Sequence, residues 1–383
     1  MAQIEKLNIG IVGAAGRGAS FRAAFDAHPA TRIHAVCDVR QEALAEAAVV
    51  LGATETYTNY EEMLEKSDID AIVIGTPMQY HTPQAIAALK RNLHVLSEVT
   101  AGVSIDECRA LVDAAKRSEG VYMMAENYVY ARPVVLVKEL VRRGLFGEVY
   151  YAEGEYIHEL KELNELTPWR RRWQTGIDGI TYGTHSLGPI LQWLSAEPGN
   201  AVEPGKPADR VARVSCEGSG HHYRDPRGDF YENQDTCLML CKTVRGSLIK
   251  IRVDMLSERP HAMHNHCLQG TTGCYESGRG PGERHKIWLA DVCKDRDTWI
   301  DLFDLEEAYM PELWRHPPEA ALQAGHGGGD YFEVLDFVQS IVAGAPCPIG
   351  IHEAMDMTLP GLVSQLSIAN GGAWMDVPDS RAW

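Results

Sequence analysis

The fold of the N-terminal part is decided by the stretch Leu7-Asn8-Ile9-Gly10-Ile11-Val12, which runs directly into Gly13-Ala14-Ala15-Gly16-Arg17-Gly18. An apolar run that ends in a glycine-rich loop predicts a buried strand that turns into a helix. Within the G-x-G-x-x-G pattern, Gly13 matches the tight turn and Gly18 the close packing of helix and strand, while Ala15 replaces the middle glycine. Such a loop brings the backbone close to a pyrophosphate at a helix N-terminus. We therefore expect cofactor contacts at Gly13, Ala15, Gly16, Arg17 and Gly18.

An acidic residue stands where this interpretation requires one. Asp38 ends the apolar run Arg32–Cys37, 20 residues beyond Gly18. A carboxylate at this position accepts a hydrogen bond from the ribose 2′-hydroxyl of NAD and repels the 2′-phosphate of NADP. Arg40 lies nearby and weakens that preference. Strand, loop, helix, strand and acid occur in order, and the sequence predicts NAD as the cofactor.

The alternation of apolar and amphipathic segments up to Ala125 is typical of a doubly wound α/β domain. Helical spacing is expected over Gln41–Leu51, Pro83–Lys90 and Ile105–Ser118, the last with Ser104 as its N-cap. Buried parallel strands are expected at Leu7–Val12, Arg32–Cys37, Ala71–Ile74, His94–Leu96 and Val121–Ala125. Residues 1–126 are thus predicted to form a Rossmann domain.

After about Asn127 the pattern changes to an α+β domain with a mainly antiparallel sheet, which we assign to residues 127–383. A helix is expected at Pro133–Arg143 and long alternating strands at Glu148–His158 and Thr236–Asp254. Loops rich in glycine and proline are expected at 196–210, 278–283 and 311–329, and two helices close the chain, at Tyr331–Ala343 and His352–Asn370. The sequence does not decide whether these two closing helices pack on the second domain or back on the first.

Composition narrows the class of protein. The 383 residues are 45% hydrophobic and 23% charged, which is typical of a globular protein with an ample core. The net charge of −17 repels phosphate backbones, so we expect no nucleic-acid partner. No apolar run is long enough for a bilayer, no signal pattern opens the chain, and nine cysteines lack a CxxC pair. We expect a cytoplasmic protein without a membrane partner, assembled as a homodimer or homotetramer.

The stretch Gly75-Thr76-Pro77-Met78-Gln79-Tyr80-His81, continued by His94-Val95-Leu96-Ser97-Glu98, resembles the Gfo/Idh/MocA oxidoreductase family. The resemblance covers essentially the whole chain. It implies further cofactor contacts at Thr76, Pro77, His81, Glu98 and Asn127. Members usually continue with Glu-Lys-Pro and carry an aspartate four residues before a catalytic histidine. Here Val99 takes the lysine position, and Thr181 stands four residues before His185.

Other segments are similar to one branch of that family, the NAD-dependent glycosidases of glycoside hydrolase family 109, which also commonly lack the lysine. Membership of a related branch, the sulfosugar glycosidases that use the same chemistry, is an alternative interpretation of these segments. The matching segments are 123–127, 154–159, 184–189, 269–271 and 325–328. A later tyrosine of the branch has no match here, because Arg259–His264 occupies its region.

The resemblance implies a cycle in which NAD⁺ oxidises the sugar at C3, the C2 proton is removed, and the aglycone leaves by elimination. Water then adds at C1 and the ketone is reduced again. Tyr156 is the implied C2 base, His185 handles the C3 hydroxyl proton or the water, and Glu126 orients the substrate. Each also has a structural interpretation: Glu126 as a cap, Tyr156 as a strand aromatic and His185 as a histidine at a helix start.

Further candidates for the substrate site are Tyr182, His261, His326 and Arg170. The histidines His261 and His264 are close enough in sequence to suggest a zinc site, but strand alternation places them on opposite faces. We therefore expect no metal here, and we interpret these histidines as polar residues that line a cleft. His326 is either a substrate contact or part of a plain turn. Arg170 lies in the cationic cluster Trp169–Trp173. This cluster is either an anion site, for a sugar carboxylate or sulfonate or for cofactor phosphates, or a solvated turn or a set of salt bridges to another subunit.

The sequence therefore predicts an NAD-dependent, redox-neutral glycosidase that acts on a small-molecule glycoside, with an anionic sugar as an open option. The alternative enzyme class is an NAD-dependent sugar or cyclitol dehydrogenase. A non-enzymatic sensor of sugar and nucleotide is a third class, for which Glu126, Tyr156 and His185 have no use.

Overall fold

The computed structural model describes residues 6–196, 209–280 and 282–383, with His264 described by its backbone alone. Most of the loop expected at 196–210, and one residue of that expected at 278–283, therefore lie outside the described residues. The chain divides into two compact units. The first comprises Met1–Tyr130, Pro317–Met355 and Ser380–Trp383, and the second Ala131–His316 and Asp356–Asp379. No helix among the described residues has the length and apolar character needed to span a membrane.

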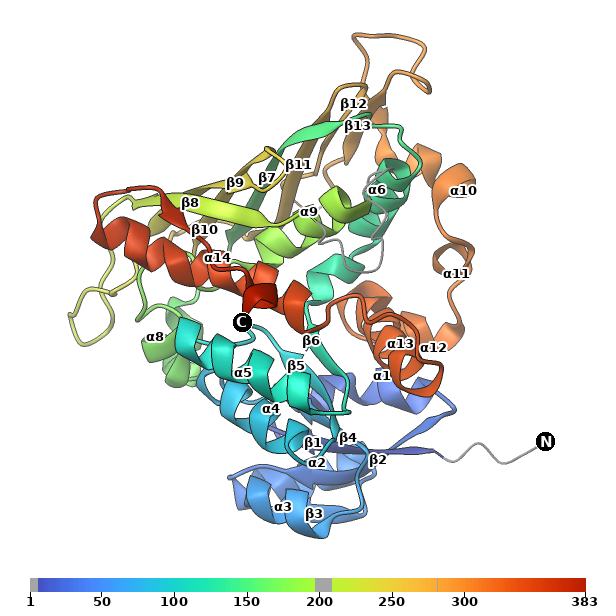
Figure 1. Ribbon diagram of the computed structural model, residues 1–383, viewed down its shortest axis with the longest axis vertical. Coiled ribbons are helices and arrows are strands. Elements are labelled where there is room, and N and C mark those ends of the chain that lie inside the picture. The colour runs from blue at the N-terminus through green and yellow to red at the C-terminus, as the bar shows by residue number, and fades with distance from the viewer. Residues whose placement is uncertain (1–5, 197–208, 281) are drawn as a thin grey trace. The chain divides into compact units, whose positions relative to one another are not determined.

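The first unit contains a six-stranded parallel sheet in the order β3-β2-β1-β4-β5-β6 (Figure 1). This is the strand order of a Rossmann fold, and it confirms the expected doubly wound sheet. The short strand β3 and the following helix α3 were not expected, because three and seven residues carry little periodicity. The strands are β1 Leu7–Val12, β2 Thr31–Cys37, β3 Glu55–Tyr57, β4 Ala71–Ile74, β5 His94–Glu98 and β6 Tyr122–Ala125.

Helices connect these strands, as βαβ units require. Ser104 caps α5 as predicted, because its Oγ accepts a hydrogen bond from the Glu107 amide at 3.2 Å. The helices up to β6 are η1 Arg17–Phe21, α1 Arg22–Ala27, α2 Gln41–Leu51, α3 Tyr60–Lys66, η2 Met78–Tyr80, α4 His81–Leu89 and α5 Ile105–Arg117.

Part of the C-terminal chain belongs to the first unit. Helix α13 (Gly329–Val342) packs against α1 and against η3 (Asn127–Tyr130). His28 after α1 stacks on Tyr331 of α13, with ring centroids 4.6 Å apart. The sequence left the packing partner of this closing helix open, because periodicity identifies a helix but not the core on which it packs. The other short helices of this unit are α12 Glu319–Leu322, η5 His326–Gly328 and η6 Ser380–Ala382.

The second unit is built on a nine-stranded sheet in the order β14-β13-β12-β11-β7-β10-β9-β8-β15. Among the strand pairs formed by the described residues of this sheet, β7–β10 alone is parallel, so the sheet is mainly antiparallel, as expected. The strands are β7 Val149–Ile157, β8 Val211–Gly218, β9 Thr236–Thr243, β10 Leu248–Asp254, β11 Ala262–Gly270, β12 Gly273–Glu276, β13 Lys286–Leu289, β14 Ile300–Asp301 and β15 Met375–Asp376.

The single long strand expected at Thr236–Asp254 is wrong. The segment forms the hairpin β9–β10, and Gly246 in the connecting turn has a φ of +104°. Only glycine adopts such a conformation without strain, so this residue permits the turn. The Arg245-Gly246 pair is a sequence signal for a turn. It was overlooked because apolar and polar residues alternate on both sides of it, as in one continuous strand.

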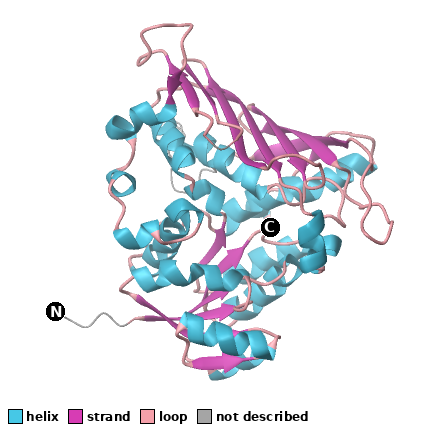
Figure 2. Ribbon diagram, turned by 180° about the vertical axis from the view of Figure 1, so that it is seen from behind, coloured by secondary structure: helices cyan, strands magenta, loops and turns pink. Residues whose placement is uncertain are grey.

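Helices cover one face of the second sheet. Figures 1 and 2 show α9 (Thr184–Ala196) and α14 (Ile351–Ala369) on the same face. Helix α9 packs on β7, β10 and β11, and the Cys216 amide of β8 donates to Ser367 Oγ of α14 at 2.8 Å. The remaining helices of this unit are α6 Arg132–Arg142, α7 Lys161–Leu166, α8 Trp169–Trp173, η4 Leu302–Leu305, α10 Glu306–Tyr309 and α11 Glu312–Arg315.

The first turn of α9 lies directly against the backbone of β7. A Cβ atom at Gly154 would sit 2.4 Å from the Ser186 carbonyl oxygen, a separation that no side chain tolerates. The glycine therefore sets how closely α9 approaches the sheet.

We predict that Gly154→Ala lowers the free energy of unfolding by about 1–3 kcal/mol, because α9 must shift away from β7. Urea unfolding monitored by circular dichroism measures the loss. The control is Gly280→Ala, where the nearest atom to an added Cβ is the flexible end of Glu283 at 3.3 Å. Equal unfolding midpoints for the two variants would contradict the assigned packing.

Candidate active site

Three glycines meet at the carboxyl ends of β1 and β4, where the strand order reverses. A Cβ at Gly13 would lie 2.6 Å from the Gly75 carbonyl carbon, and one at Gly75 would lie 2.5 Å from the Gly18 nitrogen. Gly13 also has a φ of +77°. The loops after β1 and β4 thus pack backbone against backbone at the topological switch point, which is where doubly wound sheets bind dinucleotides.

Asp38 is buried at the end of β2 and holds the glycine-rich loop. Its carboxylate accepts a hydrogen bond from the Ala15 amide at 3.0 Å and pairs with the Arg40 guanidinium, whose Nε lies 3.0 Å from Oδ1. Burial opposes ionisation, but the hydrogen bonds from Arg40 and Ala15 outweigh it and lower the pKa of Asp38. The Ala15 amide is therefore bound by Asp38, whereas Gly16 is exposed.

The loop after β4 is fixed from within the protein. The two ring nitrogens of His81 lie 2.8 Å from the Thr76 carbonyl oxygen and 2.9 Å from that of Thr100. The ring is 2% exposed, burial lowers its pKa, and both of its nitrogens face backbone carbonyl oxygens. His81 thus holds the loop that carries Thr76 and Pro77, and its contribution to cofactor binding is through that loop.

Arg17, at the start of η1, joins the glycine-rich loop to α13 and β5. Its Nε lies 2.6 Å from Glu98 Oε1, and its Nη1 lies 3.6 Å from Asp330 Oδ2. Burial opposes the charge, but Glu98 and Asp330 raise the pKa of Arg17. His326 is exposed, and its imidazole pairs with Asp330, because its Nδ1 lies 2.8 Å from Asp330 Oδ1. The structure thus brings the predicted residues Arg17, Glu98 and His326 together through Asp330, which was not predicted.

A second unpredicted acid, Glu333 of α13, is fully buried near this cluster. Burial, together with Asp330, Glu98 and Glu126, raises the pKa of Glu333 well above its usual range. Within the described chain neither of its carboxyl oxygens has a hydrogen-bond partner. The folded protein therefore favours the neutral form of the Glu333 carboxyl more strongly than water does.

Glu126 and Asn127 follow β6 and are both buried. Glu126 Oε1 accepts a hydrogen bond from the Tyr128 amide at 3.2 Å, so its predicted structural role as a cap is present. The Asn127 amide oxygen is buried without a partner among the described residues, as is Nη2 of Arg17. Buried polar atoms of this kind point to a ligand or water.

These observations fit a dinucleotide. Glycines line the switch point, an acid ends β2, and orphaned polar atoms lie on Arg17 and Asn127. The residues that would hold the cofactor are those of the loops after β1, β4, β5 and β6 together with Asp38.

The second unit carries a cluster of aromatic and imidazole side chains at the end of β7. The ring of Tyr156, 5% exposed, lies 5.3 Å from that of His185 and 5.7 Å from that of Tyr182, measured between centroids. Tyr182 and His185 are 5.2 Å apart. His185 is the second residue of α9 and is 7% exposed, so the contact of α9 with Gly154 places it beside Tyr156. The predicted Tyr156, Tyr182 and His185 are thus brought together.

Two more histidines extend this cluster. His158 Nδ1 lies 2.8 Å from Tyr156 Oη, and the His158 ring lies 4.5 Å from that of His261. Burial, with His261, Arg170 and His185 nearby, lowers the pKa of His158 to about 4. His261 was predicted for the substrate site, whereas His158 was missed. The signal was its place two residues after Tyr156, which puts both side chains on the same face of a strand.

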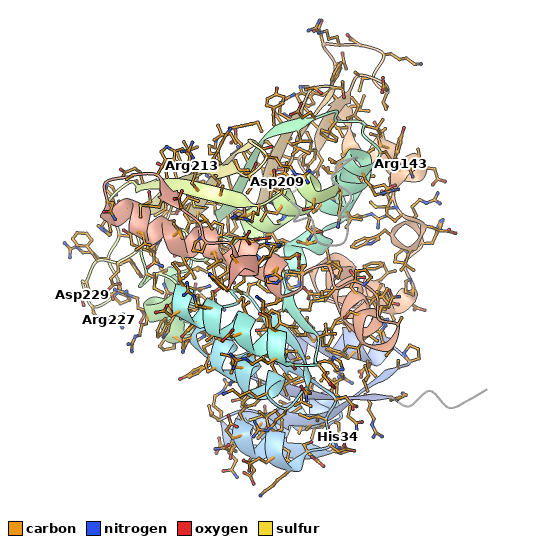
Figure 3. All side chains as sticks on the ribbon, in the orientation of Figure 1. His34, Arg143, Asp209, Arg213, Arg227 and Asp229 are labelled. Carbon is orange, nitrogen blue, oxygen red and sulfur yellow. The ribbon has the colours of Figure 1, made fainter. Side chains whose placement is uncertain are left out.

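The predicted cationic cluster Trp169–Trp173 forms the short helix α8, and its arginines differ in their contacts. Arg171 is tied to Asp225 and Glu232 of the β8–β9 loop, whose Arg227 and Asp229 are labelled in Figure 3. Arg170 lies over the Trp169 ring and donates to Gln174 Oε1 at 2.8 Å. Its Nε is buried without a partner in the described part of the chain. Arg171 therefore forms salt bridges within its own chain, and Arg170 remains the candidate for an anion.

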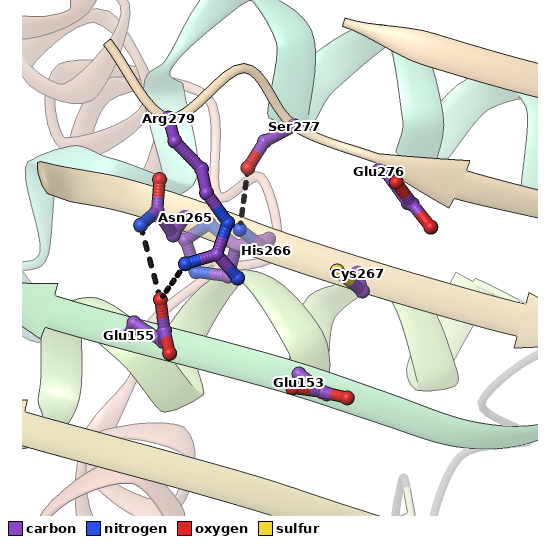
Figure 4. A pocket seen from close by; sticks show the side chains of 8 residues that line it. All are labelled: Glu153, Glu155, Asn265, His266, Cys267, Glu276, Ser277 and Arg279. Carbon is purple, nitrogen blue, oxygen red and sulfur yellow. Dashed lines mark hydrogen bonds and ion pairs between the residues drawn. The ribbon is translucent and has the colours of Figure 1, made fainter.

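The opposite face of the same sheet carries a polar pocket of about 220 Å³ (Figure 4). Two of its charged groups pair with each other, since Glu155 Oε2 lies 3.0 Å from Arg279 Nη1. The same oxygen accepts a hydrogen bond from Asn265 Nδ2 at 3.1 Å. Glu155 alternates with Gly154 and Tyr156 along β7, so it faces away from their side of the sheet. Among the described residues no group of three histidine, cysteine, aspartate or glutamate side chains is arranged to hold a metal ion.

Comparison with known proteins agrees with this geometry. Residues 130–382 match the family model "Glycosyl hydrolase 109, C-terminal domain", and residues 7–126 match "Oxidoreductase family, NAD-binding Rossmann fold". The chain is 31% identical to a glycosyl hydrolase family 109 protein of Saccharopolyspora erythraea, over 98% of this chain and 83% of the relative. It is 30% identical to an alpha-N-acetylgalactosaminidase of Shewanella oneidensis, over 98% and 85%.

Solved structures share the fold. A levoglucosan dehydrogenase in complex with NADH and levoglucosan is 19% identical, with a TM-score of 0.79 over 98% of this chain and all of that one. A myo-inositol 2-dehydrogenase of Lactobacillus plantarum is 18% identical, with a TM-score of 0.72 over 98% of this chain. Because residues 7–126 match the NAD-binding family model, they form an NAD-binding Rossmann domain, and NAD is the cofactor, as predicted.

We predict that Asp38→Ser raises the affinity for NADP⁺ relative to NAD⁺ by at least about tenfold. The substitution removes a carboxylate that repels the 2′-phosphate and releases Arg40 to bind it. Isothermal titration with each nucleotide measures the ratio of dissociation constants. In the control Asp38→Ser/Arg40→Ala the gain should largely disappear. An unchanged ratio in Asp38→Ser would show that Asp38 does not face the ribose.

We predict that Glu333→Gln makes the cofactor-free protein increasingly more stable than the wild type as the pH rises. A carboxyl with a raised folded-state pKa stabilises the protein below its unfolded pKa, and that contribution is lost as the pH rises toward the folded value. The difference in unfolding free energy should therefore grow between about pH 5 and about pH 7.5, by at most about 1.4 kcal/mol per pH unit.

Urea unfolding of both proteins at the two pH values tests this. Glu46→Gln, which alters an exposed residue of α2, is the control and should show no comparable slope. A pH-independent difference for Glu333→Gln would mean that Glu333 is ionised in the folded protein.

Proposed function

The chain belongs to glycosyl hydrolase family 109, and we propose that it is an NAD-dependent, redox-neutral glycosidase. The observation that carries this proposal is the pair formed by Tyr156 and His185, both buried and 5.3 Å apart between ring centroids. A phenol and an imidazole side by side supply two proton-transfer groups, which is what elimination and addition at a sugar require.

When bound, NAD⁺ supplies reversible oxidation of a sugar hydroxyl, here that at C3, to a ketone. A C3 ketone makes the neighbouring C2 proton acidic. We assign removal of this proton to the Tyr156 oxygen, after which the electron pair left at C2 forms the C1–C2 double bond and the aglycone oxygen leaves C1.

His185 is assigned the proton transfers at oxygen. An imidazole has one nitrogen that can accept a proton and one that can donate a proton, so it can pass protons in either direction. It takes the C3 hydroxyl proton and later directs the water that adds to C1, with the water proton passing to the aglycone. We assign Glu126 to orienting the substrate hydroxyls.

The residues at two other positions support a cofactor that is used transiently. Val99 and Thr181 stand where related dehydrogenases carry a lysine and an aspartate, and neither side chain titrates in the physiological range. This leaves the Tyr156 cluster as the proton-transfer group. The alternative, a dehydrogenase that releases NADH and a ketosugar, has no more support from the comparisons.

The choice of sugar rests on the similarity to an alpha-N-acetylgalactosaminidase, so 4-nitrophenyl α-N-acetylgalactosaminide is the first substrate to test within a panel of 4-nitrophenyl glycosides. The panel also includes anionic sugars, because the guanidinium of Arg170 could bind an anion: its Nε is buried without a protein partner in the described chain.

We predict that the protein, turning over in heavy water, releases free sugar with deuterium at C2 and without net formation of NADH. Deuterium enters because C2 is deprotonated and then reprotonated from solvent-exchanged groups. Mass spectrometry and NMR of the sugar measure the label, and absorbance at 340 nm measures NADH. Tyr156→Phe and His185→Ala should each reduce turnover by at least about 100-fold while NAD⁺ still binds.

Two outcomes would overturn the proposal. NADH that accumulates in step with sugar consumption indicates a dehydrogenase. Free sugar without deuterium at C2 excludes elimination and requires an ordinary pair of acid and base carboxylates.

A further inference from the structure

We propose that His158 is a positioning residue that accepts the phenolic proton of Tyr156, so that a tyrosine–histidine pair removes the C2 proton. This inference rests on the proposed glycosidase function. It concerns a side chain to which neither the sequence patterns nor the comparisons give a role.

The backbone fixes the pair from both sides. Tyr156 and His158 lie on the same face of the chain at the end of β7, two residues apart. Ile157 between them pairs with Asp254 of β10 and with Ala262 of β11, and the His158 amide donates to the Asp254 carbonyl at 2.9 Å. The 2.8 Å separation of Tyr156 Oη and His158 Nδ1 is therefore held by a sheet rather than by a free loop.

The direction of this hydrogen bond follows from the surroundings of His158. The groups that act on its charge are His261, Arg170 and His185, which oppose protonation together with burial, and Glu159, which favours it. The balance keeps the ring neutral at pH 7. A neutral ring whose Nδ1 lacks a proton accepts from the phenol, and its own proton is then on Nε2.

An acceptor in this position changes what the tyrosine can do. An isolated phenol has a pKa near 10 and is a poor base at neutral pH while it holds its proton. In the pair, the O–H bond of Tyr156 breaks as an N–H bond forms at His158 Nδ1, and the phenolic oxygen takes the C2 proton. The electron pair left at C2 expels the aglycone as already described. The two proton movements occur together, because full transfer to His158 in advance is strongly uphill.

The pair is restored without any other reactant. When the C2 carbon takes back a proton from Tyr156, His158 returns its proton to the phenolic oxygen. Atoms and charge therefore balance over the cycle, and the only net change is the addition of water across the glycosidic bond.

The first test needs no turnover. Protein labelled with ¹⁵N-histidine is studied by NMR, and the His158 signals are assigned by their loss in His158→Asn. We expect a neutral ring at pH 7 with the proton on Nε2. A proton on Nδ1, or an imidazolium, at pH 7 would overturn the proposal whether or not the glycosidase function is correct.

The second test uses His158→Asn, whose side-chain oxygen replaces Nδ1 as an acceptor but takes up no proton. We expect kcat on the best 4-nitrophenyl glycoside to fall by about 100-fold with KM little changed. The wild-type kcat should be flat between about pH 6 and about pH 8. In the variant kcat should rise with pH by up to about tenfold per unit, because it depends on ionised tyrosine. The isotope effect of a C2-deuterated substrate should increase.

The chain offers a matched control. Tyr275 Oη and His285 Nδ1 also lie 2.8 Å apart, with burial lowering the pKa of His285, but this pair belongs to β12 and to the segment before β13. His285→Asn should leave kcat, its pH profile and the isotope effect unchanged.

The outcomes separate this inference from the proposed function. If the wild type places no deuterium at C2, the glycosidase proposal fails first. If the wild type does so and His158→Asn keeps its kcat, or loses activity with an unchanged pH profile and isotope effect, then His158 is merely structural and the inference is overturned.

Discussion

The contact between the first turn of α9 and the backbone of β7 is the constraint on which the second unit depends. It exists only because residue 154 has no side chain, since a Cβ there would lie 2.4 Å from the Ser186 carbonyl oxygen. With the helix this close, His185 at its second position lies beside Tyr156, two residues further along the strand. The close packing that Gly154 permits thus brings together Tyr156 and His185, the two groups that the proposed reaction uses.

In the first unit, too, close contacts between glycines position the site, and ion pairs hold it in place. Backbone contacts among Gly13, Gly18 and Gly75 create the turn at the switch point, and Arg17 in that turn is held by Glu98 and Asp330. Because Asp330 belongs to α13, a helix more than 300 residues along the chain helps to fix the glycine-rich loop. Burial raises the pKa of Glu333 and so favours its neutral form, which limits the negative charge that collects around a single guanidinium.

The sequence predicted what is local. The glycine loop, Asp38, five of the six strands of the Rossmann sheet and the cap at Ser104 are each signalled within a few residues, and so were found. The assignment of α13 to the first unit, and with it the roles of Asp330 and Glu333, depends on contacts across the whole chain. The hairpin β9–β10 was taken for one strand because both halves alternate. His158 was overlooked, although its spacing from Tyr156 signalled a shared face.

The central claim is that the sugar is oxidised and reduced within one turnover. The most direct measurement uses a 4-nitrophenyl glycoside that carries deuterium at C3 and follows where that deuterium goes. The account predicts that deuterium at C3 slows turnover, because the C3–D bond must break, while the released sugar retains that deuterium and none accumulates in the reduced cofactor pool. Deuterium that appears in accumulating NADH, together with a C3 ketosugar, would contradict the account.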